Sequence, residues 1–311
     1  MTTARKKIMN NYTKGSLALF TARVLSGLNV NAMGYLLPLW IAPIGCVTLR
    51  LVFGAVVFWI VSIFSKPETV AFNDKLKLVA LGGVGIFGYM SLYAVSLSHT
   101  TPVSFAIFNA MQPLWVVIAS AVFFREGVDA RKLMGIVIGF AGALLCILSE
   151  PNHDVADNPL LGNVLSIAAS IIYAIYLVFS ARMVGHLSRM TILRYTFSSA
   201  AVVALSVTWM VGFSAPLFEG GLKTTPLLVL AFVLVFPTVI TYFLIPIGLK
   251  YLNSTVVAIY GYVTLIVASV VSFMTGVDKF EPVILLSLLF IGASIYFVGV
   301  SDRKSAGKSA G

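Results

Sequence analysis

Charged side chains are scarce in this sequence. Only 10% of its 311 residues are Asp, Glu, Lys or Arg, 59% are hydrophobic, and the mean hydropathy is +1.00. An ordinary soluble domain carries about 25% charged residues. A water-soluble fold needs more polar material than this to cover itself, so a large part of the apolar surface must face lipid.

The residues that usually build metal, redox and catalytic sites are also few. The two cysteines, Cys46 and Cys146, form no C-x-x-C pair, and the three histidines, His99, His153 and His186, lie in or near the gaps between apolar runs. No acidic cluster, Gly-x-Ser-x-Gly turn or histidine pair is present. We therefore predict no cofactor, no metal site and no enzymatic activity. The alternatives to this prediction are an intramembrane enzyme and a channel.

Long apolar runs are what the sequence has in abundance. Crossing the hydrocarbon core takes about 20 apolar residues in a helix. Runs of this kind cover 15–37, 44–64, 76–97, 102–124, 132–149, 160–181, 190–213, 225–249, 254–275 and 282–300. The predicted fold is all-α and integral to the membrane, with ten transmembrane helices.

The positive charges indicate how these helices are oriented. When the gaps between the runs are numbered alternately, one set holds 17 Lys and Arg residues and the other only Lys223 and Lys279. Basic residues collect on the cytoplasmic side of membrane proteins, so both termini are predicted to be cytoplasmic, in a bacterial inner membrane. The net charge of +10 is spread over these short gaps, which argues against nucleic acid as a partner.

The two halves of the sequence resemble each other. Leu49-Arg50-x-x-Phe53 recurs as Leu193-Arg194-x-x-Phe197, and Tyr93 recurs as Tyr242, at offsets of 144 and 149. We predict five-helix repeats at 15–149 and 160–300, joined by an extracytoplasmic loop at 150–159 and flanked by cytoplasmic segments 1–14 and 301–311. Five is odd, so the second repeat is inverted, an arrangement typical of transporters with a site near the midplane.

Several motifs resemble the EamA-type members of the drug/metabolite transporter superfamily over roughly 15–300. They are Gly88-Tyr89 through Leu97, Pro113 followed by Glu126, and Gly135-x-x-x-Gly139-x-x-Gly142. The second half departs from the pattern, because no proline occurs at Tyr262–Leu265, the place equivalent to Pro113. The resemblance implies alternating access through a cavity lined by helices 1, 3, 4, 6, 8 and 9.

Polar side chains within the apolar runs are the candidates for binding a substrate. They are expensive in hydrocarbon and should face the bundle interior or a cavity. Spacings of three or four residues place several of them on shared helix faces. The candidates are Arg23, Ser26, Asn29, Tyr89, Tyr93, Asn109, Gln112, Trp115, Tyr173, Thr238, Tyr242 and Tyr262. Interhelical hydrogen bonding is the alternative role for such residues.

Three arginines lie within the runs. Arg23 is expected either to meet an anionic group or to extend to the headgroups. Arg50 and Arg194 occupy equivalent places on helices that the resemblance places peripherally, so a structural role is expected for both. No Asp or Glu lies well inside a run, so the sequence gives no direct support for a coupling ion.

The candidate residues predict a transporter of a small polar or zwitterionic metabolite such as an amino acid, and the family resemblance implies alternating access and export. The uncharged hydrogen-bonding groups suit a neutral body, and Arg23 suits one carboxylate. The alternative substrates are drugs, nucleotide sugars and exchanged organic anions. The expected partners are the substrate and the lipid bilayer, with the chain as a monomer or homodimer.

Overall fold

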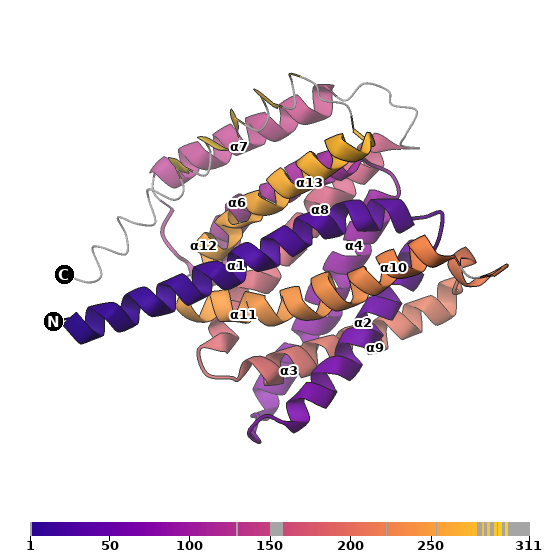
Figure 1. Ribbon diagram of the computed structural model, residues 1–311. Helices are drawn as coiled ribbons and strands as arrows, with labels where there is room; N and C mark the ends of the chain where they lie inside the picture. Colours follow the sequence, from indigo (N-terminus) through magenta and orange to yellow (C-terminus); the bar gives the residue numbers. More distant parts are fainter. Residues whose placement is uncertain are drawn as a thin grey trace.

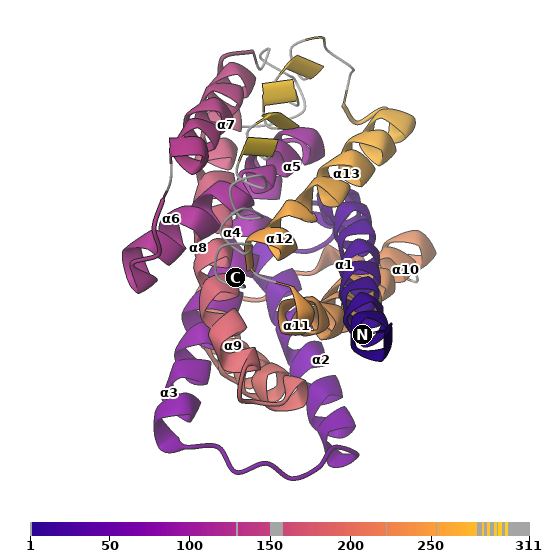
Figure 2. The ribbon, with the colours of Figure 1, turned by 90° about the vertical axis from the view of Figure 1, so that its left-hand side faces the viewer.

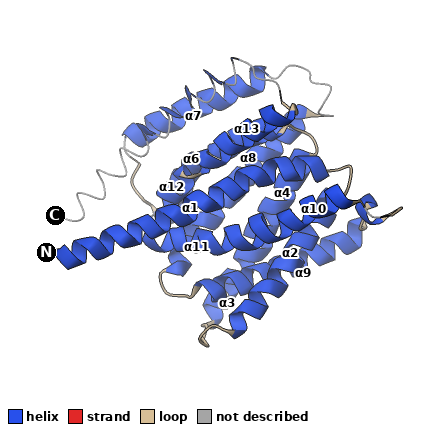
Figure 3. Ribbon diagram, viewed as in Figure 1, coloured by secondary structure: helices blue, strands red, loops and turns tan. Residues whose placement is uncertain are grey.

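The computed structural model describes residues 2–128, 130–149, 158–221, 223–252 and 254–278, with isolated residues between 282 and 297. Within this part of the chain every regular element is helical and no strand occurs (Figure 1, Figure 3). The elements are α1 Thr2–Leu36, α2 Pro43–Ile63, α3 Phe72–Ala80, η1 Leu81–Ile86, α4 Phe87–Leu97, α5 Pro102–Ala110, α6 Gln112–Phe124, α7 Ala130–Ser149, α8 Pro159–Val184, α9 Arg189–Val211, η2 Pro216–Phe218, α10 Thr224–Val233, η3 Leu234–Ile240, α11 Thr241–Tyr251, α12 Ser254–Ile259 and α13 Gly261–Thr275.

The helices follow the predicted apolar runs. Each run from 15–37 to 254–275 coincides with one helix or with consecutive helical elements, whereas 282–300 lies largely outside the described residues. Seven of these segments are long and apolar enough to cross a bilayer, and α1 and α7 are not among them. The chain is therefore an all-helical, multi-pass membrane protein, and the count of ten spans stays a prediction.

The first helix is longer and more polar than an ordinary span. It begins at Thr2, so residues 2–14, expected to lie outside the membrane, continue the helix of the first run. α1 packs between α11 and α13, as Figure 1 shows. Arg23 and Asn29 of this helix are almost fully buried inside the bundle. Because protein and not lipid covers this face, α1 tolerates polar residues that lower its hydropathy.

The remaining helices pack around α1 and its neighbours. α2 lies along α9, and α4 lies along α8. Figure 1 and Figure 2 both show α7 at one edge of the bundle and α3 at the opposite edge. The interior of the bundle is therefore formed by helices from both halves of the sequence.

Two spans contain a stretch of π-helix. η1 interrupts the span from α3 to α4 and includes Gly82, Gly83 and Gly85, while η3 interrupts the span from α10 to α11 and includes Pro237. A proline removes the hydrogen bond to the carbonyl four residues earlier, which favours such an irregular turn. The third run of each predicted half thus carries one π-helical segment.

Two other spans are broken. The run 102–124 is divided at Met111 into α5 and α6, and the run 254–275 is divided at Tyr260 into α12 and α13. Pro113 explains the first break, because it cannot donate to the carbonyl of Asn109. The second break occurs without a proline, and it lies 149 residues after the first, the offset that also relates Tyr93 to Tyr242.

Candidate functional site

A narrow cavity lies in the middle of the bundle, where α1, α2, α4, α5, α8, η3, α11 and α13 meet. Its volume of about 30 Å³ is room for roughly one or two water molecules. Eight of the twelve predicted site residues line it, namely Arg23, Ser26, Asn29, Tyr89, Tyr93, Asn109, Tyr173 and Tyr242. The structure therefore brings together polar and aromatic groups from segments far apart in the sequence.

Arg23 is the cationic group that α1 contributes. Its side chain is only 3% exposed, and Nη2 donates to Oε1 of Gln112 at 3.3 Å and to the carbonyl of Val257 at 3.1 Å. Its guanidinium carbon lies 5.9 Å from the ring centre of Tyr173. The Val257 carbonyl lies in the turn before the break at Tyr260. Arg23 is thus held in the interior by the broken span, and it does not extend to the headgroups.

The break at Met111 is bridged in a similar way. The amide of Leu114 donates to the carbonyl of Met111 at 2.9 Å, and not to that of Ala110 four residues earlier. The Tyr262 hydroxyl donates to the Ala110 carbonyl at 2.7 Å. Tyr262, a predicted site residue, therefore joins the two broken spans and does not line the cavity.

Aromatic rings and the hydrogen-bonded pair of Asn29 and Tyr93 form the wall of the cavity. Asn29 Nδ2 donates to the Tyr93 hydroxyl at 2.8 Å. Tyr89 lies with its ring centre 4.4 Å from that of Tyr173, and Tyr93 meets Phe105 edge-on at 4.6 Å. Such pairs fix ring positions and present hydroxyl groups to a bound molecule.

Several polar atoms of the site have no hydrogen-bond partner. They are Nε of Arg23, Oδ1 of Asn29, Oδ1 of Asn109 and Nε2 of Gln112. Buried polar atoms are almost always paired, so each such atom needs an explanation. Two of these atoms are donors and two are acceptors.

Arg50 was expected to be peripheral, and the structure shows that this is wrong. Its side chain is 3% exposed and lines the same cavity as Arg23. Nε donates to Oγ1 of Thr238 at 2.9 Å, and Nη1 lies 3.9 Å from Sδ of Met33. Thr238, a predicted site residue, therefore positions Arg50 and does not itself line the cavity. The hydropathy pattern showed that Arg50 lies within a span, but it did not show which side of α2 faces inwards.

Two predicted residues fall elsewhere. Gln112 is buried behind the cavity wall, where it accepts from Arg23. Trp115 packs edge-on against Phe140 of α7, with ring centres 5.2 Å apart. It was assigned to the cavity face of one continuous helix, but the break at Met111 reorients α6 relative to α5. Arg194 remains peripheral as expected, near the rings of Trp59 and Tyr195.

Two larger spaces accompany the central cavity. One, of about 310 Å³, lies at the end of the bundle formed by the α1–α2 and α4–α5 connections, between Tyr35 and Thr101. The other, of about 530 Å³, lies between α3, η1 and α8 and is lined mainly by apolar side chains such as Val84 and Ile172. Neither brings together the polar groups that surround Arg23.

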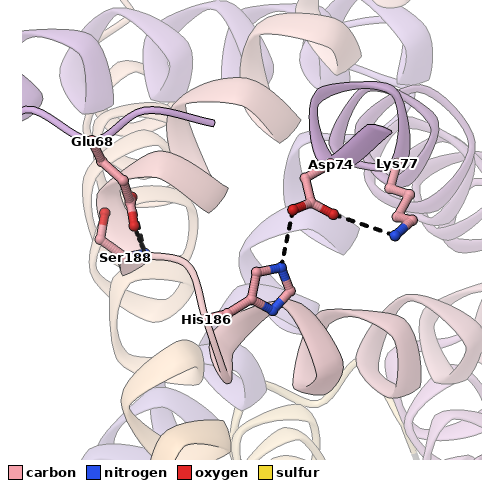
Figure 4. A network of polar contacts seen from close by, with 5 residues as sticks. All are labelled: Glu68, Asp74, Lys77, His186 and Ser188. Atoms are coloured by element: carbon pink, nitrogen blue, oxygen red, sulfur yellow. Dashed lines mark hydrogen bonds and ion pairs between the residues drawn. The ribbon is translucent and has the colours of Figure 1, made fainter. Parts of the chain in front are cut away.

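A polar network joins the α2–α3 connection and the start of α3 to the α8–α9 connection (Figure 4). Both oxygens of Glu68 accept from the backbone amide of Ser188, the residue before α9, at 3.1 Å. Asp74 contacts Lys77 at 3.3 Å and His186 at 3.2 Å. Partial desolvation raises the pKa of Glu68, but hydrogen bonds from Thr191 and Ser188 outweigh it, so that its pKa lies below the ordinary value. This network fixes one end of the bundle, away from the cavity.

Known proteins resemble this chain over most of its length. The uncharacterized transporter YyaM of Bacillus subtilis (strain 168) is 24% identical over 264 residues, which cover 84% of each protein. An uncharacterized transporter of Archaeoglobus fulgidus is 26% identical over 208 residues, 66% of this chain and 68% of that protein. One crystal structure matches with a TM-score of 0.68 at 16% identity, covering 94% of this chain and 99% of the other, which shows a common fold.

The family comparison is more specific than these pairwise matches. The model of the EamA-like transporter family matches residues 13–148 and again residues 160–300. Together the two matches span most of the chain, and they confirm the resemblance predicted from the sequence motifs. With its buried polar cavity and its membrane-spanning helices, this chain belongs to the EamA-like transporter family of the drug/metabolite transporter superfamily.

Proposed function

We propose that this transporter carries a small metabolite with a carboxylate group, such as an amino acid, out of the bacterial cytoplasm. The observation that supports this substrate is the buried Arg23, surrounded by the unpaired polar atoms of Asn29, Asn109 and Gln112. A guanidinium group pairs well with a carboxylate, and the unpaired acceptors suit an ammonium or hydroxyl group. Export is the direction that the family resemblance implied.

Alternating access fits the small size of the cavity. A volume of about 30 Å³ is far below the roughly 300 Å³ or more of a ligand pocket. A metabolite therefore binds only when the helices around the cavity move apart, and the described conformation is a closed one. The π-helical segments and the broken spans next to the site are the places where such movement costs least.

The same proposal includes two inverted five-helix repeats, at 15–149 and 160–300. Two matches to one family model and two breaks separated by 149 residues support a duplication. Inversion follows if each half contains five spans, and the charge distribution of the sequence supports cytoplasmic termini.

Thiol labelling tests this orientation. In a variant lacking Cys46 and Cys146, we expect Thr69→Cys to react with a membrane-impermeant maleimide only after the cells are permeabilised. Glu219→Cys should react in intact cells, because 219 lies in a gap predicted to be extracytoplasmic. Both side chains occupy connections outside the helices. Labelling of Thr69→Cys in intact cells would refute the orientation.

Flux in reconstituted vesicles tests the substrate and the site. We expect the wild-type protein to carry carboxylate-bearing probes, alanine and succinate among them, in preference to glucose 6-phosphate. Arg23→Gln should lower this flux about tenfold to a hundredfold, since a hydrogen bond to a charged group contributes about 1.5–3 kcal/mol. Gln112→Ala should lower it less, because it frees one Arg23 hydrogen without removing the charge.

Trp115→Phe is the matched control for these variants. Trp115 was a predicted site residue, yet it packs on α7, so its replacement should leave flux near the wild-type level. Sugar-phosphate flux without any carboxylate flux would contradict the substrate. Normal flux in both Arg23→Gln and Gln112→Ala would contradict the site.

A second candidate function, exchange of organic anions, is favoured by one observation. Arg50 places a second guanidinium group at the same cavity, where the sequence had indicated only Arg23. A net-neutral zwitterion leaves one of these two charges without a counter-ion.

A further inference from the structure

Arg50 is a buried charge that a substrate with a single carboxylate leaves uncompensated. It projects from α2, seven residues after the helix begins at Pro43, and its side chain is only 3% exposed. Within the described residues its neutral contacts are a threonine hydroxyl and a methionine sulfur. A buried ion stabilised only by neutral groups is costly, and this cost marks a functional position in a membrane protein.

The position of Arg50 is fixed by the irregular span opposite. Pro237 has no amide hydrogen to donate to the carbonyl of Val233. The Thr238 hydroxyl donates to the Val233 carbonyl at 2.8 Å. The lone pairs of the hydroxyl oxygen are thereby directed towards Nε of Arg50, which donates to it at 2.9 Å. The π-helical segment η3 thus provides an acceptor that holds the guanidinium group at the cavity.

Among the described residues, no carboxylate balances the charge around the cavity. Arg23 and Arg50 both line it, and both lie within Coulombic range of Tyr89. The acidic residues of the described part lie elsewhere, at Glu68, Asp74, Glu126, Glu219 and Asp278. The other six acidic residues of the sequence fall outside the apolar runs. Two cationic groups therefore face one site that lacks a described carboxylate.

The two cations are held at different levels along α1. Arg50 contacts Met33, and Met33 lies ten residues after Arg23 on α1. Ten residues of helix correspond to a rise of about 15 Å. Arg23 contacts the Val257 carbonyl. The hydrogen bond from Asn29 to Tyr93 lies between the levels of Arg23 and Met33 on α1. An elongated molecule with an anionic group at each end matches this arrangement better than a compact anion.

We propose that Arg50 is the second anion-binding group of the transport site and that the substrate is a small dicarboxylate. The inference rests on the transport function proposed above and specifies its substrate class. One carboxylate pairs with Arg23 and the other with Arg50, so the loaded site is electrically neutral. Asn29 and Asn109 contact the uncharged middle of the substrate.

Counterflow in vesicles that contain the purified protein tests this assignment. We expect labelled succinate to exchange faster than labelled alanine in the wild-type protein. Arg50→Gln should lower the rate of succinate exchange relative to that of alanine by about tenfold or more, the loss of one charge-assisted contact. Arg194→Gln is the matched control, because Arg194 is the repeat counterpart of Arg50 but lies beside Trp59 and Tyr195.

Arg50→Lys covers the case in which Arg50→Gln does not fold. This variant keeps the charge and loses the fork of donors, so we expect the KM for succinate to rise and that for alanine to stay unchanged. Alanine exchange without succinate exchange, or equal losses for both probes in the Arg50 variants, would overturn the dicarboxylate assignment and leave the proposed function standing. Exchange of neither probe by the wild-type protein would overturn both.

Discussion

Replacing Gly82 with alanine is expected to prevent the bundle from packing correctly. Gly82 lies in η1, which packs directly against α9. A Cβ atom at this position would collide with the carbonyl oxygen of Thr196 and the Ser199 hydroxyl and would lie 2.8 Å from the Thr196 carbonyl carbon. Because the obstacle includes backbone, a change of rotamer cannot relieve it. We expect the free energy of unfolding to fall by about 3 kcal/mol, the upper end of the usual cost of overpacking a core.

Gly83→Ala is the control, because the adjacent glycine has room. Its added Cβ would lie 3.4 Å from a methyl group of Val203, an ordinary contact. The fraction of protein that remains monodisperse in detergent after heating provides the measurement. The monodisperse fraction of Gly82→Ala should fall at a clearly lower temperature than that of the wild type or of Gly83→Ala. Equal stability of the two variants would contradict the close approach of η1 to α9.

Replacing Gly27 with alanine is expected to abolish transport. Its Cβ would lie 2.6 Å from Cβ of Val267 and 2.8 Å from the carbonyl oxygen of Thr264, so α1 and α13 would have to separate. The two helices are joined on either side of Gly27. Thr264 donates to the Arg23 carbonyl at 3.2 Å, and Asn31 donates to the Ala268 carbonyl at 2.9 Å. Separation would withdraw Arg23 from the cavity.

The matched control for Gly27 is Gly88→Ala, whose Cβ would meet Ile172 at an unstrained 3.6 Å. Initial rates of carboxylate flux in vesicles, normalised to folded protein, provide the comparison. We expect Gly88→Ala to transport normally and Gly27→Ala to retain less than about a tenth of the rate, which corresponds to at least about 1.4 kcal/mol. Normal flux by Gly27→Ala would show that close α1–α13 packing is not required.

The positions of most helices could be predicted because hydropathy reports the length of chain that lipid can cover. Hydropathy carries less information about irregularities inside a span. The break at Met111 is explained by Pro113, but Tyr260 precedes no proline, and its break lies beside the contact between Arg23 and the Val257 carbonyl. Such contacts are tertiary, and one sequence does not reveal them.

The candidate site could be predicted in part for a similar reason. Tyr93 and Asn109 lie in the interior, where polar groups within an apolar run were expected because they need a partner in hydrocarbon. Trp115 was misplaced because a continuous helix was assumed across Met111. Arg50 was misplaced because α2 is apolar on nearly every side, so its sequence does not indicate which side faces the protein.

The two broken spans differ in how permanent they are. At Met111 the bend is covalent in origin, because Pro113 can never supply the missing amide hydrogen, whatever surrounds it. At Tyr260 no residue forbids a regular helix, and the Val257 carbonyl is occupied by Arg23, a side chain from the other half of the molecule. If Arg23 turns to a substrate carboxylate, that carbonyl becomes free to accept from its own helix. The first half therefore contains a permanent helix break at Met111, whereas the break at Tyr260 in the second half can close into a regular helix when substrate binds.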